Sequence, residues 1–141
     1  MKSARTLITT CLLLTAATLL AQTESQRLMK VNVPFTFGVE NHSLPAGEYT
    51  VFTVTPERSI RIVSADGKHS AVINTLANYA NEPSTKSSLV FHKYGGDYYL
   101  VQVWTVGQNV ARNPLPSKRA TESASGGKPQ TFTVISLADR R

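Results

Sequence analysis

Three histidines are the side chains in this 141-residue sequence best suited to acid–base chemistry or metal binding. His42, His69 and His92 are far apart in the chain, and none lies at ligand spacing with another histidine or a carboxylate. The single cysteine, Cys11, lies in an apolar N-terminal run, so the chain beyond that run has no thiolate chemistry. The sequence therefore predicts no metal site and no cofactor.

Nucleophilic catalysis is not indicated either. The sequence has no Gly-x-Ser-x-Gly elbow and no glycine loop of the kind that cradles phosphates. His92 and Asp97 fall near the same end of a predicted hairpin, but no nucleophile or orienting group stands at a defined spacing from them. We interpret the pair as a strand histidine and a turn aspartate, and we predict no catalytic residue.

Aromatic side chains concentrate in residues 88–106, which hold five of the eleven Phe, Tyr and Trp residues. Gly-Gly-Asp at 95–97 divides this stretch into two β-rich runs, which is typical of a β-hairpin. A two-residue turn would set Phe91 opposite Leu100, whereas a three-residue loop would set it opposite Val101. The three-residue loop gives one uniformly apolar face, so it is the preferred register.

The other face of this predicted hairpin is both aromatic and polar. In the preferred register it presents His92, Tyr94, Tyr98 and Trp104. These side chains could form a stacking platform for sugar rings, or they could anchor a protein partner. Ordinary packing of aromatic side chains across two strands would produce the same pattern. These four residues are the candidate binding site.

Several shorter runs also read as strands. Residues 29–39 alternate between apolar and polar side chains, which predicts one half-buried strand. Pro34 places this strand at an edge of the sheet, or occupies a position that makes no ladder hydrogen bond. Asp66-Gly67 separates two further runs and predicts a tight turn that sets Ile60 opposite Ile73. Residues 107–130 contain several Ser, Gly and Pro residues and are predicted to be irregular, with a short helix after Ser117 and disorder favoured over part of the stretch.

The fold class follows from these elements. About seven to eight short strands with turns between them, and no long helical pattern, predict an all-β fold. We expect residues 22–141 to form one domain, an antiparallel β-sandwich or a small barrel.

Residues 1–21 have the features of a cleaved signal peptide. Lys2 and Arg5 precede an apolar run at 7–20 that is too short for a retained membrane span, and the small Ala21 could precede cleavage. The mature chain is therefore expected to lack a transmembrane span and to be exported to the periplasm or outside the cell. Its net charge would be about +4 without clustered basic residues, and export argues against a nucleic-acid partner. The sequence does not identify a partner, and a glycan and an envelope protein are the two kinds of partner considered.

The segments VPFTFGVENHSLPAGEYTV and LVFHKYGGDYYLVQVW resemble a family of small exported proteins that recur in acidobacteria. The likeness extends over residues 31–122 and rests on Pro-Ala-Gly turns and strand aromatics. It implies an exported β domain, and it implies no activity, substrate or catalytic residue.

Three classes of function stay open. The first is an exported non-catalytic β-domain with a structural, partner-binding or glycan-binding role. The second is a hydrolase that acts on cell-wall or polysaccharide material, which should show a cleft containing carboxylates or a histidine. The third is an accessory subunit of an envelope complex, which should show an apolar patch or an unpaired edge strand.

Overall fold

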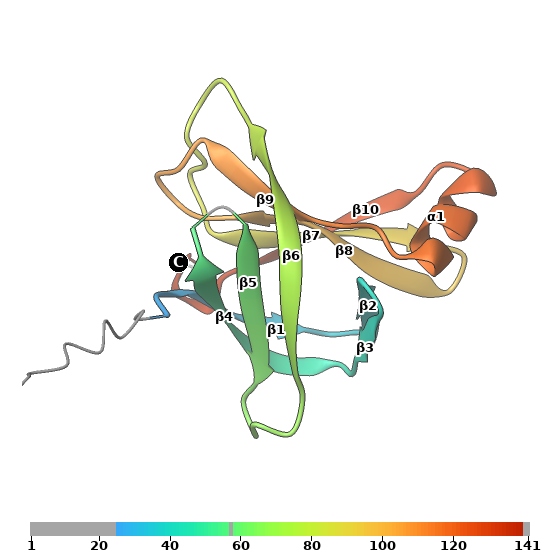
Figure 1. The fold of residues 1–141 in the computed structure, drawn as a ribbon, viewed down its shortest axis with the longest axis horizontal. Helices are drawn as coiled ribbons and strands as arrows, with labels where there is room; N and C mark the ends of the chain where they lie inside the picture. Colours follow the sequence, from blue (N-terminus) through green and yellow to red (C-terminus); the bar gives the residue numbers. More distant parts are fainter. Residues whose placement is uncertain (1–24, 57, 140–141) are drawn as a thin grey trace, which may run out of the picture.

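The computed structural model describes residues 25–56 and 58–139, and strands dominate it (Figure 1). The strands are β1 (Arg27–Val33), β2 (Phe37–Val39), β3 (His42–Leu44), β4 (Gly47–Thr55), β5 (Ser59–Ser64), β6 (Ser70–Tyr79), β7 (Ser88–Tyr94), β8 (Asp97–Trp104), β9 (Val110–Pro114) and β10 (Gln130–Ile135). An α-helix, α1 (Lys118–Ser125), and a 3₁₀ turn, η1 (Leu137–Asp139), follow β9 and β10 respectively. The all-β prediction is confirmed.

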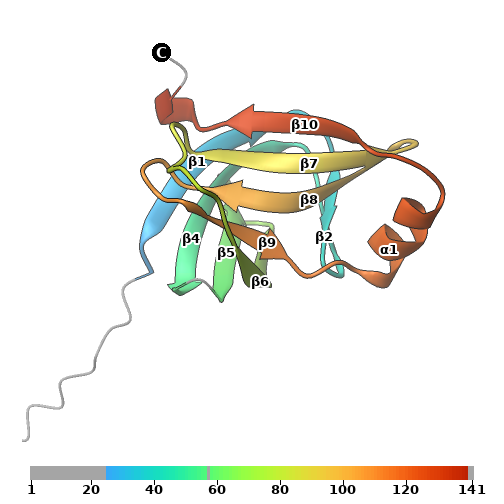
Figure 2. The same cartoon turned by 90° about the horizontal axis from the view of Figure 1, so that it is seen from above.

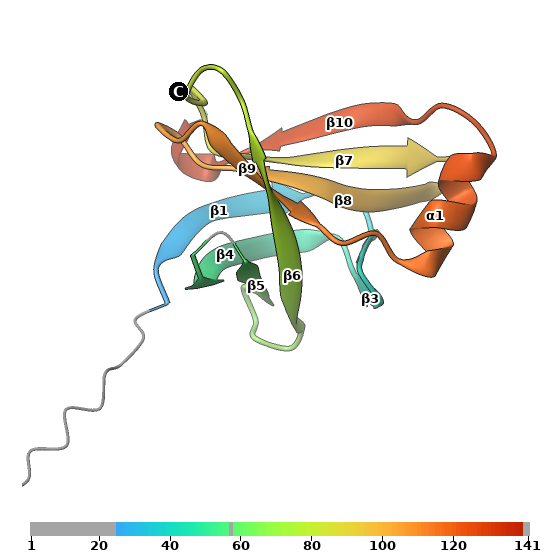
Figure 3. The same ribbon diagram turned by 45° about the horizontal axis from the view of Figure 1, so that its top comes forward.

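The strands form one open sheet that folds into two layers. The strand order is β1-β4-β5-β6-β9-β8-β2-β3, while β7 pairs with β8 and β10 pairs with β7. Strands β4, β5 and β6 run across the direction of β7, β8 and β10 (Figures 1 and 3). Strand β6 joins the layers, because its first half pairs with β5 and its second half pairs with β9.

The hydrophobic core lies between these two layers. Phe37 is at its centre, since its ring lies 5.5 Å from that of Tyr49 in β4 and 5.2 Å from that of Phe91 in β7. Both contacts are edge-to-face, an arrangement that aromatic pairs favour. The remaining fully buried large side chains are Val31, Val33, Val39, Val51, Ile60, Ile62, Ile73, Leu89 and Val103.

The first predicted strand is divided in two. Its alternation is correct, since Val31, Val33, Phe37 and Val39 are all buried. However, β1 ends before Pro34 and lies at the edge of the sheet beside β4, whereas β2 pairs in parallel with β8. Proline has no backbone N–H to donate to a ladder, which favours the break at this point. This division contributes to ten strands instead of the predicted seven to eight.

The β5–β6 hairpin has the predicted register but a different turn. Ile60 lies opposite Ile73, as expected. The backbone N–H of Gly67 donates to the Ser64 carbonyl, so the two residues at 65–66 occupy the centre of the turn. The aspartate of this pair accepts hydrogen bonds from the Ser64 hydroxyl and from a backbone N–H, which stabilise the turn. Gly67 has φ +73, in the left-handed region where glycine is favoured.

The β7–β8 hairpin combines both registers considered for it. Near the turn Phe91 lies opposite Leu100, as in a two-residue turn, whereas farther away Leu89 lies opposite Val103, as in a three-residue loop. A β-bulge joins the two halves, and Val101 is its unpaired residue. The preferred register is therefore wrong for the half of the hairpin next to the turn.

The predicted irregular stretch at 107–130 contains both β9 and α1. Helix α1 begins where predicted, because the Ser117 side chain accepts a hydrogen bond from the Ala120 N–H at 3.0 Å. The helix packs at the turn end of the β7–β8 hairpin (Figure 2). Strand β10 follows the helix and pairs with β7.

Candidate functional site

The bulge in β8 separates one of the four predicted binding residues from the others. Tyr98 lies opposite Lys93, so its side chain lies on the inner face of the hairpin. Its ring stacks on Phe35, with centroids 3.8 Å apart. The prediction that Tyr98 shares a face with His92 is therefore wrong, because the extra residue at Val101 inverts the alternation next to the turn.

The other three predicted residues share the opposite face. Trp104 lies opposite Ser88, and residues 88, 90, 92 and 94 point to one side because side chains alternate along a strand. His92, Tyr94 and Trp104 are all partly exposed. Strands β10, β7 and β8 lie side by side here (Figure 2). We call this surface the hairpin outer face and define it as Ser88, Val90, His92, Tyr94, Gln102, Trp104, Thr131 and Thr133.

A hollow of about 330 Å³ surrounds Trp104 at one end of the hairpin outer face. The indole Nε1–H donates to the Gln102 side-chain oxygen at 3.2 Å, which limits rotation of the ring. Glu82 and Ser84 from the β6–β7 connection line the hollow, together with Thr133 from β10. The Trp104 ring thus lies in a hollow that also contains one carboxylate, three hydroxyl groups and the apolar side chains of Ala80 and Val90.

A second hollow, of about 250 Å³, lies at the other end of the same face. The Tyr94 ring lies 6.2 Å from that of His92 and 6.2 Å from that of Tyr99. Tyr99 is only 7% exposed, and its hydroxyl lies 3.3 Å from the Ser123 hydroxyl of α1. The end of α1 and Lys128 form the outer wall of this hollow.

A larger hollow, of about 670 Å³, lies between the β2–β3 hairpin, the start of β8 and the first turn of α1. We call it the β2–α1 groove. It brings His42 together with Glu40, Asp97, Arg119 and Glu122. The sequence did not indicate this group, since its members come from three elements separated by many residues and have no local spacing in common.

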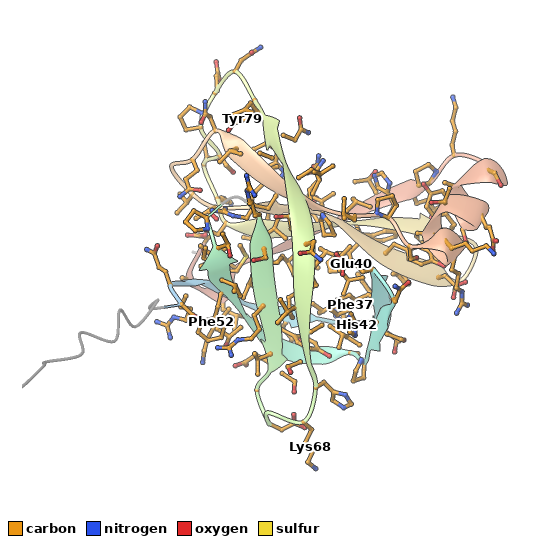
Figure 4. The ribbon with its side chains drawn as sticks, in the orientation of Figure 1. Phe37, Glu40, His42, Phe52, Lys68 and Tyr79 are labelled. Atoms are coloured by element: carbon orange, nitrogen blue, oxygen red, sulfur yellow. The ribbon has the colours of Figure 1, made fainter. Side chains whose placement is uncertain are left out.

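Two carboxylates of the β2–α1 groove already have structural partners. Glu40 accepts a hydrogen bond from the backbone N–H of Asn74 at 2.7 Å, which ties the β2–β3 turn to β6 (Figure 4). Glu40 has φ +47, so this turn is held in a left-handed conformation that is costly for a residue with a side chain. Asp97 forms an ion pair with Arg119 at 3.2 Å. These two carboxylates therefore have structural roles, and the groove that contains them is also lined by the Tyr98 and Tyr99 rings.

Two residues outside these hollows have shifted pKa values: Tyr49 in β4 and Asp66 in the β5–β6 turn. Burial raises the pKa of Tyr49, and the charge of Asp66 adds to that effect. The hydrogen bond from Ser64 lowers the pKa of Asp66, and the bond from the Lys68 backbone adds to it. Both shifts reflect local packing and turn formation.

Within residues 25–56 and 58–139, no group of three or more His, Cys, Asp or Glu side chains is placed to hold a metal ion. No helix in that part of the chain is long and apolar enough to cross a membrane. The sequence matches no known protein-family model, and it matches no curated protein and no solved structure.

Proposed function

We propose that the protein is an exported, non-catalytic β-domain that binds a glycan on the hairpin outer face. The observation that carries the proposal is the partly exposed Trp104 ring, held by Gln102 within a hollow lined by polar groups. Binding sites for small ligands typically combine an apolar aromatic surface with a few polar groups that fix orientation. Sugars match this combination, because their C–H faces stack on aromatic rings while their hydroxyl groups exchange hydrogen bonds.

The architecture supports a rigid binding surface. We class the two layers as a β-sandwich, because β1 pairs with β4 and β10 pairs with β7 without a ladder between β1 and β10. The hairpin outer face lies on the layer that contains β7 and β8, whose inner side chains Leu89 and Phe91 are fully buried. Side chains on such a packed sheet keep their relative positions, which lowers the entropy cost of ligand binding.

A hydrolase is the second candidate, because the β2–α1 groove brings a histidine close to carboxylates. The contacts of Glu40 with Asn74 and of Asp97 with Arg119 favour a structural role for those two carboxylates.

An accessory subunit is the third candidate, since Val72 and Leu76 on β6 are 54% and 62% exposed. The Tyr98 and Tyr99 rings also line the β2–α1 groove, but Tyr98 stacks on Phe35 and the carboxylates of Glu40 and Asp97 already have partners. We therefore prefer glycan binding on the hairpin outer face.

Export is part of the proposal, and it rests on the sequence of residues 1–21, which lie outside the described residues. The charged start, the apolar run and the small Ala21 are typical of a cleaved signal peptide. We expect intact-mass analysis of the exported protein to show a chain that begins near Gln22. Retention of residues 1–20 in that protein would contradict export by this route.

The chain has one tryptophan, so its fluorescence reports directly on the proposed site. We expect titration with cellohexaose or chitohexaose to change the emission of Trp104 in a saturable way. Trp104→Ala should weaken retention on insoluble cellulose or chitin by about tenfold or more, because the stacking surface is removed. Val72→Ala is the control, since it removes exposed apolar area in the half of β6 that pairs with β5, away from β7 and β8. Equal retention of Trp104→Ala and the original protein would overturn the proposal.

A further inference from the structure

We infer, on the basis of the proposed function, that the ligand is an extended, uncharged polysaccharide chain that binds both the Trp104 hollow and the Tyr94 hollow. These hollows lie at the two ends of the hairpin outer face. The chain would therefore follow the direction of β7 along the surface. The inference names a second contact site, the Tyr94 hollow, and a minimum ligand length.

The minimum length of the ligand follows from the register of β7 and β8. Trp104 of β8 lies opposite Ser88 of β7. Tyr94 is six residues beyond Ser88 in β7 and lies on the same face. A β-strand rises about 3.3 Å per residue, so the two aromatic anchors are about 20 Å apart. A disaccharide is too short to reach both, whereas a longer oligosaccharide can.

The surface between the anchors can accommodate a flat chain. Gln102, Val90 and His92 are partly exposed there, and Thr131 and Thr133 of the neighbouring strand β10 are exposed. Their hydroxyl, amide and imidazole groups can exchange hydrogen bonds with sugar hydroxyls. A β-1,4-linked chain is extended and flat, so it matches the surface of a sheet better than a coiled chain does.

The charges along this face favour an uncharged chain. The side chains between the two hollows carry no Lys, Arg, Asp or Glu, although the full sequence has a net charge of +6. Glu82 lies at one end, and Lys128 and the ion pair between Asp97 and Arg119 lie at the other. A polyanion would meet no continuous row of positive charges here, and an uncharged chain would lose no solvation of its own charges.

The Tyr94 hollow is fixed in place by α1. The Tyr94 ring packs against Tyr99, and the Tyr99 hydroxyl lies beside Ser123. The helix in turn is tied to the hairpin by the ion pair between Arg119 and Asp97. The second anchor is therefore held at a set position relative to Trp104, which allows a long chain to contact both sites at once.

The test compares short and long probes by Trp104 fluorescence. Cellobiose, cellohexaose, chitobiose and chitohexaose would be titrated into the full mature protein and into Tyr94→Ala. We expect one of the two hexasaccharides to bind about tenfold or more tightly than its disaccharide. In Tyr94→Ala this difference should disappear, while disaccharide affinity stays the same. Lys93→Ala is the matched control, because residue 93 is adjacent but lies on the inner face over Tyr98, and it should keep the difference.

The outcomes separate the inference from the proposed function. Equal affinity for disaccharide and hexasaccharide in the original protein would overturn the two-anchor inference, while glycan binding at Trp104 would stand. An undiminished preference for the hexasaccharide in Tyr94→Ala would overturn the second anchor. A steep loss of affinity with added salt would contradict the uncharged ligand. If none of the four saccharides changes the fluorescence, glycan binding itself fails.

Discussion

At the scale of single residues, Asp66 stabilises the β5–β6 turn through its ionised carboxylate. Its side chain accepts hydrogen bonds from the Ser64 hydroxyl at 2.6 Å and the Lys68 backbone N–H at 2.9 Å, and these bonds lower its pKa. A carboxyl group with a lowered folded-state pKa contributes stability above its unfolded value, about 3.9 for aspartate. That contribution is lost as the pH falls through the lowered folded-state pKa.

We therefore predict a pH-dependent effect of Asp66→Asn. The variant should unfold at a lower urea concentration than the original protein at neutral pH, because the charge that strengthens both hydrogen bonds is gone. The two proteins should converge when the pH is lowered through the folded-state pKa of Asp66. Urea midpoints measured at neutral and at strongly acidic pH test this expectation. A midpoint difference that is the same at both pH values would contradict it.

At the scale of elements, the β7–β8 turn requires a glycine at one of its two positions. Gly95 has φ +59, whereas Gly96 does not have a positive φ. A Cβ atom at either position would meet no other atom within 4 Å, so the two sites differ in backbone conformation alone. Gly95→Ala should therefore destabilise the protein by about 1 kcal/mol. Gly96→Ala is the matched control and should be neutral or slightly stabilising. Equal effects in chemical denaturation would contradict the turn geometry.

The register of the same hairpin shows how far a sequence can predict an element. Period-two alternation identified the buried Leu89 and Phe91, because burial of one face selects apolar residues at every second position. It could not locate the bulge, since Leu100 and Val101 are both apolar and either can lie opposite Phe91. The choice depends on packing against other elements, including the stacking of Tyr98 on Phe35. The alternation therefore placed His92, Tyr94 and Trp104 on one common face, and it placed Tyr98 on the wrong face.

At the scale of the whole molecule, the least predictable features are those that join distant segments. The parallel pairing of β2 with β8 sets Phe37 opposite Tyr98, although the two are far apart in the sequence. The β2–α1 groove depends on that pairing and on the position of α1. No local pattern encodes either feature, because each results from burial of several elements against a common core. The all-β class was predictable from the sequence, and the connectivity of the strands was not.

The common core also predicts how the molecule unfolds. Phe37 contacts Tyr49 in one layer and Phe91 in the other, so its removal should weaken both layers together. We expect Phe37→Ala to lower the free energy of unfolding by about 3–5 kcal/mol, the usual cost of removing a buried phenylalanine ring. Trp104 fluorescence reports on the β7–β8 layer, whereas far-UV circular dichroism reports on the strands of both. Within each protein, the fluorescence midpoint and the circular-dichroism midpoint should coincide, because one core implies one cooperative transition. Both midpoints should be lower in the variant than in the original protein. Separate midpoints would show that the layers unfold independently, and that Phe37 does not couple them.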